Sequence, residues 1–374
     1  MALSPLFRPV DFAALPGWAA DDSTEAFAAF RRSAFHGLAK PYKTGSLGVE
    51  SSAFAEAYAE ARRVENLDST AARAFFERHF VPALIHGFEN RPAELRANGE
   101  RSGFVTGYYE PEVEAAPART GQYAVPIFAR PDDLVDVDDA NRPADMDPYL
   151  AFARQTGNGL VEYHDRPAID GGVLAERGLE IAWLQEKVDL FFIQVQGSAR
   201  LKMTDGSVRR ITYAAKTGQR FTAIGRVLAD LGEIPLQRVT MQSIRAWLKA
   251  HPGRVDELLH HNRSYVFFKD AELDDPALGP VGAAKVQLTT GRSLAVDRLQ
   301  HTFGTPFYID APSLMAFGRP FRRLMIAQDT GSAIVGPARG DLFAGSGDAA
   351  GEIAGVVKAS ADFYALLPRG LVAR

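Results

Sequence analysis

Two aspartates stand among glycines near the C-terminal end of this 374-residue sequence. Asp329 and Asp341 lie twelve positions apart within residues 326–355, which read IAQDTGSAIVGPARGDLFAGSGDAAGEIAG. A strand, a turn around residues 336–340 and a second strand would place both carboxylates at one mouth of a barrel. Glycines in such a run let a bulky polymer approach the backbone closely. The simpler interpretation is that both aspartates only cap glycine turns.

Cleavage of a glycosidic bond is one reaction that such a site could perform. It requires a proton donor for the leaving oxygen, so the donating carboxyl must be protonated near neutral pH. A free aspartate has a pKa of about 3.9. Burial against Leu342 and Phe343, together with repulsion from an ionised Asp329, would raise the pKa of Asp341.

A competing hypothesis uses the same residues. Asp329-Thr330-Gly331-Ser332 is the tetrapeptide that aspartic proteases place at their catalytic pair of aspartates. That mechanism needs two aspartates that share a proton, and the sequence has no second Asp-Thr-Gly or Asp-Ser-Gly. Gln328 also interrupts the apolar residues expected before this aspartate. A homodimer could supply the missing partner, so the hypothesis stays open.

Metal and cofactor chemistry have little support. The sequence lacks HExxH, GxSxG and GxxxxGK[ST], and the adjacent His260 and His261 would point to different faces of a helix. Residues 131–148 hold seven aspartates against Arg142, but their spacing does not follow a calcium loop, so we expect a solvated acidic loop. We therefore predict no metal and no cofactor.

Composition narrows the class of protein. Hydrophobic residues make up 46% and charged residues 24%, and 42 basic against 46 acidic residues give a net charge of −4. This balance does not favour a nucleic-acid partner. The absence of cysteine excludes disulfides and thiolate nucleophiles, and it leaves no residue for a lipoprotein anchor. The first residues lack the basic and apolar regions of a signal peptide, so we expect a cytosolic protein or one whose export segment is missing.

The hydrophobic patterns predict an α+β protein that is mainly β with N-terminal helices. Helices are expected at residues 22–37, 54–61, 69–82, 224–232 and 240–252. Asp205-Gly206 between two extended runs, 201–204 and 208–213, predicts a β-hairpin. Further extended runs are at 123–128, 189–195, 264–268, 285–288, 293–296, 306–309 and 323–328. Short strands separated by turn residues indicate a small barrel.

Seven strings in order along the chain resemble those of the membrane-bound lytic murein transglycosylases of the A type. Together they span about 240 residues, so the resemblance is specific although each string alone is weak. The strings are TGYYEP (106–111), YAVPIF (123–128), YHDRPAI (163–169), VDLFFIQVQGSARL (188–201), YAAKTGQRFTAIG (213–225), SYVFF (264–268) and the run 329–347.

The resemblance implies a double-psi β-barrel domain interrupted by an inserted, second β-rich domain. The barrel domain would comprise residues 1–111, with the N-terminal helices, plus residues 269–374. The insertion would comprise residues 112–268 and form the substrate groove with the barrel, as ligands often bind between domains.

The resemblance also implies the site residues. Asp341 stands where the family has its catalytic acid, within GDLFAGSG, and Asp329 would be the supporting carboxylate of a catalytic pair. Substrate-binding residues would be Thr106, Tyr108 and Tyr109, and, in the insertion, Gln196, Gly197 and Ser198. For each tyrosine, core packing is the alternative. Arginines among residues 313–347 could attract the carboxylates of peptide stems.

The activity implied is cleavage of peptidoglycan glycan strands with formation of 1,6-anhydromuramic acid ends. A single aspartate would act first as acid and then as base. A peptidoglycan glycoside hydrolase and a non-catalytic murein-binding module are the alternatives. The resemblance further implies a periplasmic location, often at the outer membrane, and possible contacts with cell-wall synthesis proteins.

Overall fold

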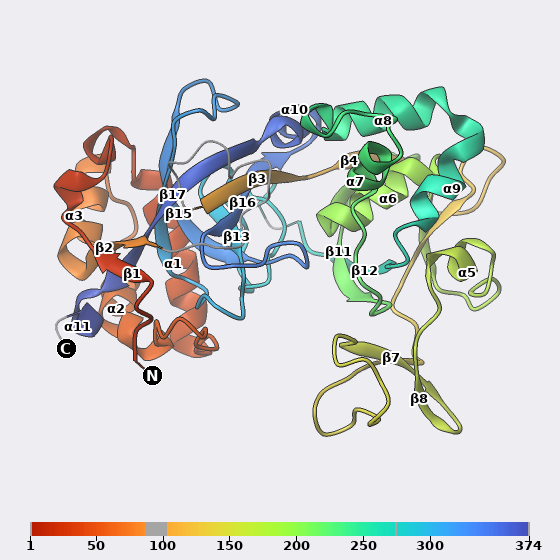
Figure 1. The fold of residues 1–374 in the computed structure, drawn as a ribbon, viewed down its shortest axis with the longest axis horizontal. Helices are drawn as coiled ribbons and strands as arrows, with labels where there is room; N and C mark the ends of the chain where they lie inside the picture. Colours follow the sequence, from red (N-terminus) through yellow and green to blue (C-terminus); the bar gives the residue numbers. More distant parts are fainter. Residues whose placement is uncertain (1, 87–102, 274, 373–374) are drawn as a thin grey trace. The chain divides into compact units, whose positions relative to one another are not determined.

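The computed structural model of the protein describes residues 2–86, 103–273 and 275–372 (Figure 1). Within them the chain forms two compact units. Unit 1 comprises residues 1–109, 276–345 and 349–374, and unit 2 comprises residues 110–275 and 346–348. The chain therefore leaves unit 1 for unit 2 after Tyr109 and returns to it at Pro276.

Unit 1 combines an N-terminal group of helices with a sheet. Its helices are α1 (Thr24–Ala39), α2 (Ala55–Arg63), α3 (Ser69–His79), α10 (Asp348–Val356) and α11 (Arg369–Val372). Its strands are β1 (Phe7–Pro9), β2 (Phe80–Ile85), β3 (Gly103–Glu110), β13 (Ser293–Val296), β14 (Pro306–Ala311), β15 (Phe321–Asp329), β16 (Arg339–Ser346) and β17 (Lys358–Pro368).

Six strands of the described part of unit 1 close into a barrel. The sheet order is β1-β2-β17-β14-β15-β13-β16-β3, and β3 also pairs with β17 through Thr106 opposite Lys358. This second pairing joins β17, β14, β15, β13, β16 and β3 into a ring, with β1 and β2 outside it. Since β13 runs parallel to β15 and antiparallel to β16, the ring mixes both kinds of pairing.

Phenylalanines dominate the core between the N-terminal helices and the barrel. The ring of Phe30 in α1 lies 5.6 Å from that of Phe76 in α3 and 5.7 Å from that of Phe80 in β2, with edge-to-face geometry. All three side chains are fully buried. Burial of one such side chain contributes about 1.5–3 kcal/mol, so these phenylalanines attach the helices to the sheet.

Unit 2 contains three small sheets and five helices of the described chain. Its strands are β4 (Glu112–Ala115), β5 (Val125–Phe128), β6 (Leu134–Asp136), β7 (Phe152–Thr156), β8 (Gly159–Val161), β9 (Glu180–Leu184), β10 (Ser198–Met203), β11 (Val208–Lys216) and β12 (Val266–Ala271). Its helices are α5 (Arg166–Asp170), α6 (Lys187–Gln196), α7 (Ile224–Asp230), α8 (Met241–Ala250) and α9 (Val255–His260).

The largest sheet of unit 2 has the order β12-β11-β10-β4. The hairpin predicted at Asp205-Gly206 is confirmed, because β10 and β11 pair antiparallel and Gly206 has a φ of 87°. A smaller sheet contains β6, β7 and β8, of which β7 and β8 form the olive hairpin of Figure 1. The predicted α+β class is confirmed.

Two predicted strands are wrong. Residues 189–195, expected to be extended, belong to the helix α6, whose Leu190, Phe191 and Ile193 are buried. A short run of apolar residues does not distinguish a buried strand from a buried helix. Residues 285–288 form only an isolated bridge, between Val281 and Gln287, and Lys285 has a φ of 62°, which a strand does not allow.

Candidate active site

The strand register places Asp329 and Asp341 at the same height in the wall of the barrel. Ala295 of β13 is the partner of Asp341 on β16 and also of Asp329 on β15. Directly paired residues project to the same face of a sheet, so both carboxylates share the face of Ala295. Neighbouring strands are about 4.8 Å apart, which puts the two backbone positions roughly 10 Å from each other, with β13 between them.

β3 supplies the hydroxyl that holds Asp341. Thr106 donates a hydrogen bond from Oγ1 to Oδ1 of Asp341 at 2.5 Å. Nη2 of Arg339 in turn donates to Thr106 Oγ1 at 2.7 Å, and the guanidinium carbon lies 5.2 Å from the ring centroid of Phe104. In the described chain, Oδ2 of Asp341 takes part in no hydrogen bond, so it is the oxygen from which a proton could be delivered.

Burial raises the pKa of the Asp341 carboxyl. The charge of Arg339 and the hydrogen bond from Thr106 act in the opposite direction, because both stabilise the carboxylate. The side chain is nevertheless partly exposed. Asp341 is therefore a carboxyl that holds its proton to higher pH than a free aspartate and that a solute can still reach.

The carboxylate of Asp329 accepts three hydrogen bonds. Its Oδ1 accepts hydrogen bonds from the backbone N–H groups of Ala283 at 3.0 Å and Thr330 at 2.9 Å, and its Oδ2 accepts one from the Tyr108 hydroxyl at 3.0 Å. Burial raises the pKa of Asp329, these three bonds lower it, and the charge on Asp341 raises it further.

Tyr108 links the carboxylate of Asp329 to an apolar cluster. Its ring lies 5.3 Å from that of Phe343, and the two pack with Leu288 and Ala295. Burial, followed by the charges on Asp329 and Asp341, raises the pKa of the Tyr108 hydroxyl well above its usual value. The hydroxyl therefore stays protonated and acts as a hydrogen-bond donor.

One detail of the predicted surroundings of Asp341 is wrong. Leu342 does not bury Asp341, because successive residues of a strand point to opposite faces and Leu342 belongs to the main core of unit 1. The two aspartates repel each other, and the charge on Asp341 raises the pKa of Asp329. An effect of Asp329 on the pKa of Asp341 stays a prediction.

Four of the predicted site residues come together in unit 1: Thr106, Tyr108, Asp329 and Asp341. Tyr109, next along β3, is buried on the other face, where a Cβ placed on Gly351 of α10 would lie 2.9 Å from its ring. Its neighbours there match the core-packing alternative. A role for Tyr109 in binding sugar stays a prediction.

Gln196, Gly197 and Ser198 lie in unit 2, where α6 meets β10. Gly197 has a φ of 83° and ends α6, a position that glycine fills with least strain. Ser198 is buried, with 5% of its surface exposed. The end of α6 explains the glycine at position 197, and the predicted contact of the three residues with substrate stays a prediction.

Arg339 is the site residue that the sequence identified least clearly, since it was one of several arginines proposed to attract peptide carboxylates. The others are placed differently: Arg322 pairs with Asp310 at 2.9 Å, and Arg323 lies over the rings of Phe317 and Phe321. Arg339 stands two residues before Asp341 on the same strand, so the two side chains project to the same face of the sheet. This spacing is the sequence signal that could have identified Arg339.

In the described part of the chain, no three acidic, histidine or cysteine side chains group in a way that could hold a metal ion. None of its helices combines the length and the apolar character that crossing a membrane requires. The predicted acidic loop contains the strand β6, and Asp136 there pairs with Arg130 at 2.8 Å.

Two family models match the chain. Residues 104–269 match the MltA specific insert domain and residues 292–367 match the 3D domain. Membrane-bound lytic murein transglycosylase A of Escherichia coli K12 is 33% identical over 258 residues, which are 67% of this chain and 61% of that relative. The chain thus spans less than two thirds of the length of this curated relative.

A solved structure of a membrane-bound lytic murein transglycosylase from Agrobacterium tumefaciens is 49% identical to this chain, with a TM-score of 0.90. The match covers 98% of this chain and 99% of that one. The chain belongs to the membrane-bound lytic murein transglycosylase A family.

The family resemblance stated from the sequence is thereby confirmed. E. coli MltA with bound chitohexaose is a further solved structure in this family that resembles the chain, with 26% identity, a TM-score of 0.68 and coverage of 98% of this chain and 96% of that one. The match to the insert domain, residues 104–269, covers most of β3 and most of unit 2, and the match to the 3D domain, residues 292–367, covers the barrel strands β13 to β17.

Proposed function

We propose that this protein is a lytic transglycosylase that cleaves the β-1,4 bond between N-acetylmuramic acid and N-acetylglucosamine in peptidoglycan. The observation that carries the proposal is the state of Asp341: partly exposed, oriented by Thr106 through one oxygen, and raised in pKa by burial. The family membership supports the substrate class, and the E. coli relative has been seen with a bound saccharide.

In the first step, Asp341 donates its proton to the oxygen that links the two sugars. As the C–O bond breaks, positive charge develops on the muramic acid ring, and the carboxylate left on Asp341 lies close enough to stabilise it. The raised pKa favours the protonated acid at the start. Thr106 fixes the orientation of the carboxyl group and leaves Oδ2 directed to the substrate.

In the second step, Asp341 takes the proton from the C6 hydroxyl of the muramic acid, whose oxygen attacks C1 and closes a 1,6-anhydro ring. One residue serves both steps because the first leaves it in the form that the second needs. The attacking hydroxyl belongs to the substrate itself, and well-oriented intramolecular groups reach effective molarities of about 10⁵ M or more.

Asp329 and Tyr108 support this acid without a proton transfer of their own. The two carboxylates repel each other when both are ionised, and this repulsion raises the pKa of Asp329. Tyr108 and two backbone N–H groups occupy Asp329. Arg339 limits the rise in the pKa of Asp341 and so keeps it able to release its proton.

A glycoside hydrolase is the second candidate, because it would use both carboxylates. Inverting hydrolases hold their carboxyl groups about 6.5–9.5 Å apart, and strand spacing alone permits such a separation for Asp329 and Asp341. The three hydrogen bonds on Asp329 favour a supporting role over activation of water.

The experiment is digestion of purified peptidoglycan by the wild type and by Asp341→Asn, followed by mass spectrometry of the soluble products. We expect anhydro products from the wild type and a rate lower by about 10²–10⁴-fold in the variant, the usual contribution of a general acid. Asp205→Asn, in the exposed turn between β10 and β11, is the control. Near-normal activity of Asp341→Asn would refute the assignment, and binding without turnover by the wild type would indicate a murein-binding module.

We also propose that the protein works in the periplasm, associated with the outer membrane, since its relatives are named membrane-bound. Cell-wall synthesis proteins are its proposed partners there. Fractionation of cells that produce the full-length protein tests the location: recovery with the outer membrane supports it, and recovery in the cytosol contradicts it.

A further inference from the structure

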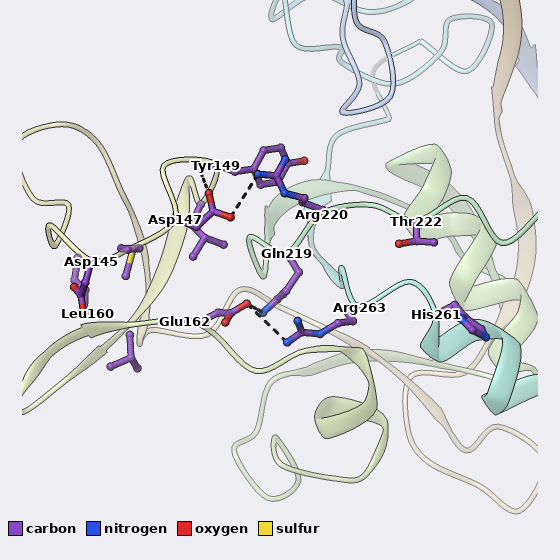
Figure 2. Close-up of a pocket in the computed structure, with 13 residues that line it drawn as sticks. Asp145, Asp147, Tyr149, Leu160, Glu162, Gln219, Arg220, Thr222, His261 and Arg263 are labelled. Carbon is purple, nitrogen blue, oxygen red and sulfur yellow. Dashed lines mark hydrogen bonds and ion pairs between the residues drawn. The ribbon is translucent and has the colours of Figure 1, made fainter. Parts of the chain in front are cut away.

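Unit 2 contains a pocket of about 590 Å³ that has no part in the chemistry proposed above (Figure 2). This volume lies within the range of about 300–1,000 Å³ that small-molecule sites usually have. Four stretches of the chain line it, residues 145–150, 160–162, 219–222 and 261–263. Among the lining residues, three carboxylates and two guanidinium groups bring charges of both signs: Asp145, Asp147, Glu162, Arg220 and Arg263.

Gln219 is the buried polar residue of this pocket, with 4% of its surface exposed. Its Nε2 donates to the backbone carbonyl of Tyr163 at 2.6 Å and lies 3.4 Å from Oε1 of Glu162. Because two acceptors face this nitrogen, the amide cannot be turned over. Its Oε1 is fully buried and accepts no hydrogen bond from the described residues. A shift of the side chain toward the pocket would let an N–H group of a ligand satisfy this oxygen.

Arg220, the next residue, presents a charged group on the same side of the pocket. Its guanidinium carbon lies 4.1 Å from the ring centroid of Tyr149, and its closest carboxylate contact is with Asp147 at 3.5 Å. Its side chain is 66% exposed. A guanidinium that lies over a ring keeps its N–H groups in a fixed plane, which suits recognition of a carboxylate.

Acidic residues lie at the edge of the pocket wall opposite Arg220. Arg263 donates to Asp165 at 2.8 Å and lies 3.8 Å from Glu162, so its charge is largely engaged by these two residues. Glu162 is half exposed, and it can offer a carboxylate oxygen to a positively charged group. In Figure 2, Gln219 lies between this pair and the stack of Arg220 on Tyr149.

These features select among ligand classes. A pyranose would need an aromatic face, but Arg220 lies over the ring of Tyr149 and the Lys216 ammonium is 5.6 Å from its centroid. A simple anion would be repelled by three carboxylates, and the described residues group no set that could hold a metal ion. A ligand that has a carboxylate, an ammonium group and amide N–H groups would match Arg220, Glu162 and Gln219, respectively.

We propose that this pocket binds a short peptide that carries both a carboxylate and an ammonium group. The carboxylate pairs with Arg220, an amide N–H donates to Oε1 of Gln219, and the ammonium group pairs with Glu162. The choice of peptide rests on the proposed function, because the glycan strands of peptidoglycan carry short peptides of this chemistry. The pocket would then recognise the peptide part of the polymer independently of the glycosidic bond.

Calorimetric titration of the full-length protein with the free stem tripeptide, alanyl-γ-glutamyl-diaminopimelic acid, tests the proposal. We expect saturable binding by the wild type and a dissociation constant about tenfold higher or more in Arg220→Ala, since a charge-assisted hydrogen bond is lost. Arg226→Ala is the matched control, because Arg226 is also an exposed arginine that pairs with an aspartate, Asp230 at 2.8 Å, and it does not line the pocket. Glu162→Gln should weaken binding as well.

Three results would overturn the proposal: no binding of the tripeptide, equal binding by the wild type and Arg220→Ala, or competition between the tripeptide and chitohexaose. Release of anhydro products from glycan strands without peptides is measured in parallel. Arg220→Ala should release them at the wild-type rate. If the wild type releases none, the proposed function fails, whereas the titration still decides the peptide site.

Discussion

At Asp341, opposing influences set the pKa of the carboxyl group. Burial raises this pKa, whereas the charge of Arg339 and the hydrogen bond from Thr106 lower it. An acid that must give up and then recover a proton works best when its pKa lies near the operating pH. The two polar neighbours therefore moderate the effect of burial on Asp341.

Arg339→Gln should move the alkaline limb of the pH–activity profile to higher pH. Activity falls on this limb because Asp341 loses its proton, and removal of a positive charge that lowers the pKa of Asp341 raises that pKa. Rates of solubilisation of peptidoglycan across the pH range measure the shift. Arg319→Gln, on an exposed loop residue, should leave the profile unchanged, and a shift of the limb to lower pH in Arg339→Gln would contradict the account.

Asp329→Asn should raise the free energy of unfolding more at pH 8 than at pH 4. The pKa of Asp329 is raised in the folded state, so the wild type loses stability as pH rises from about 3.9, the unfolded value, through the folded value. The amide does not ionise and avoids this loss, while its oxygen can still accept from the backbone. Urea denaturation of both proteins at the two pH values measures the difference. The same difference at both pH values would show that Asp329 is not destabilised by its charge.

At the scale of elements, β16 packs closely against neighbouring strands at Gly340, the residue before Asp341. A Cβ on Gly340 would lie 2.8 Å from Cδ1 of Leu294 and 3.0 Å from Cε1 of Phe363, both in the core of unit 1. The strand that carries Asp341 therefore has little freedom to move.

Gly340→Ala should lower the free energy of unfolding by about 1–3 kcal/mol, the usual cost of overpacking a core. It should also reduce activity, because β16 must shift to make room. Thermal unfolding followed by circular dichroism measures the first effect. Gly121→Ala is the control, since a Cβ there would meet no atom within 4 Å. Equal stability of the two variants would contradict the packing described.

Elements with strong local signals could be predicted from the sequence. Thr240 begins α8 with a capping box, as its position before an amphipathic run indicated. The helix expected from residue 69 begins at Ser69, and its cap is Asp68, whose side chain accepts a hydrogen bond from the backbone N–H of Ala71. The helix expected to end at residue 37 continues to Ala39. A Cβ on Gly37 would lie 2.8 Å from the ring of Tyr58, so close packing explains this glycine.

At the scale of the whole molecule, the closed ring of strands explains why the site was only partly predictable. Thr106 and Asp341 are 235 positions apart in the sequence, and Tyr108 and Asp329 are 221 apart. No local pattern specifies such pairings, which depend on the order of strands in the barrel. The resemblance supplied the residues, whereas their hydrogen bonds and the role of Arg339 required the structure.

Each compact unit has its own hydrophobic core, so we expect the protein to unfold in two calorimetric transitions. Phe30→Ala in unit 1 and Phe267→Ala in unit 2 each remove a fully buried ring, at a cost of about 3–5 kcal/mol. Each variant should lower the midpoint of a different transition by several degrees. A single transition that both variants shift equally would contradict this prediction.

Digestion of peptidoglycan in water enriched in heavy oxygen tests the central claim most directly, because it reports which oxygen attacks the sugar. If Asp341 serves as both acid and base for the substrate's own C6 hydroxyl, the released muramic acid ends are anhydro and carry no label. Incorporation of one labelled oxygen at each new end would show that water is the nucleophile and would contradict the account.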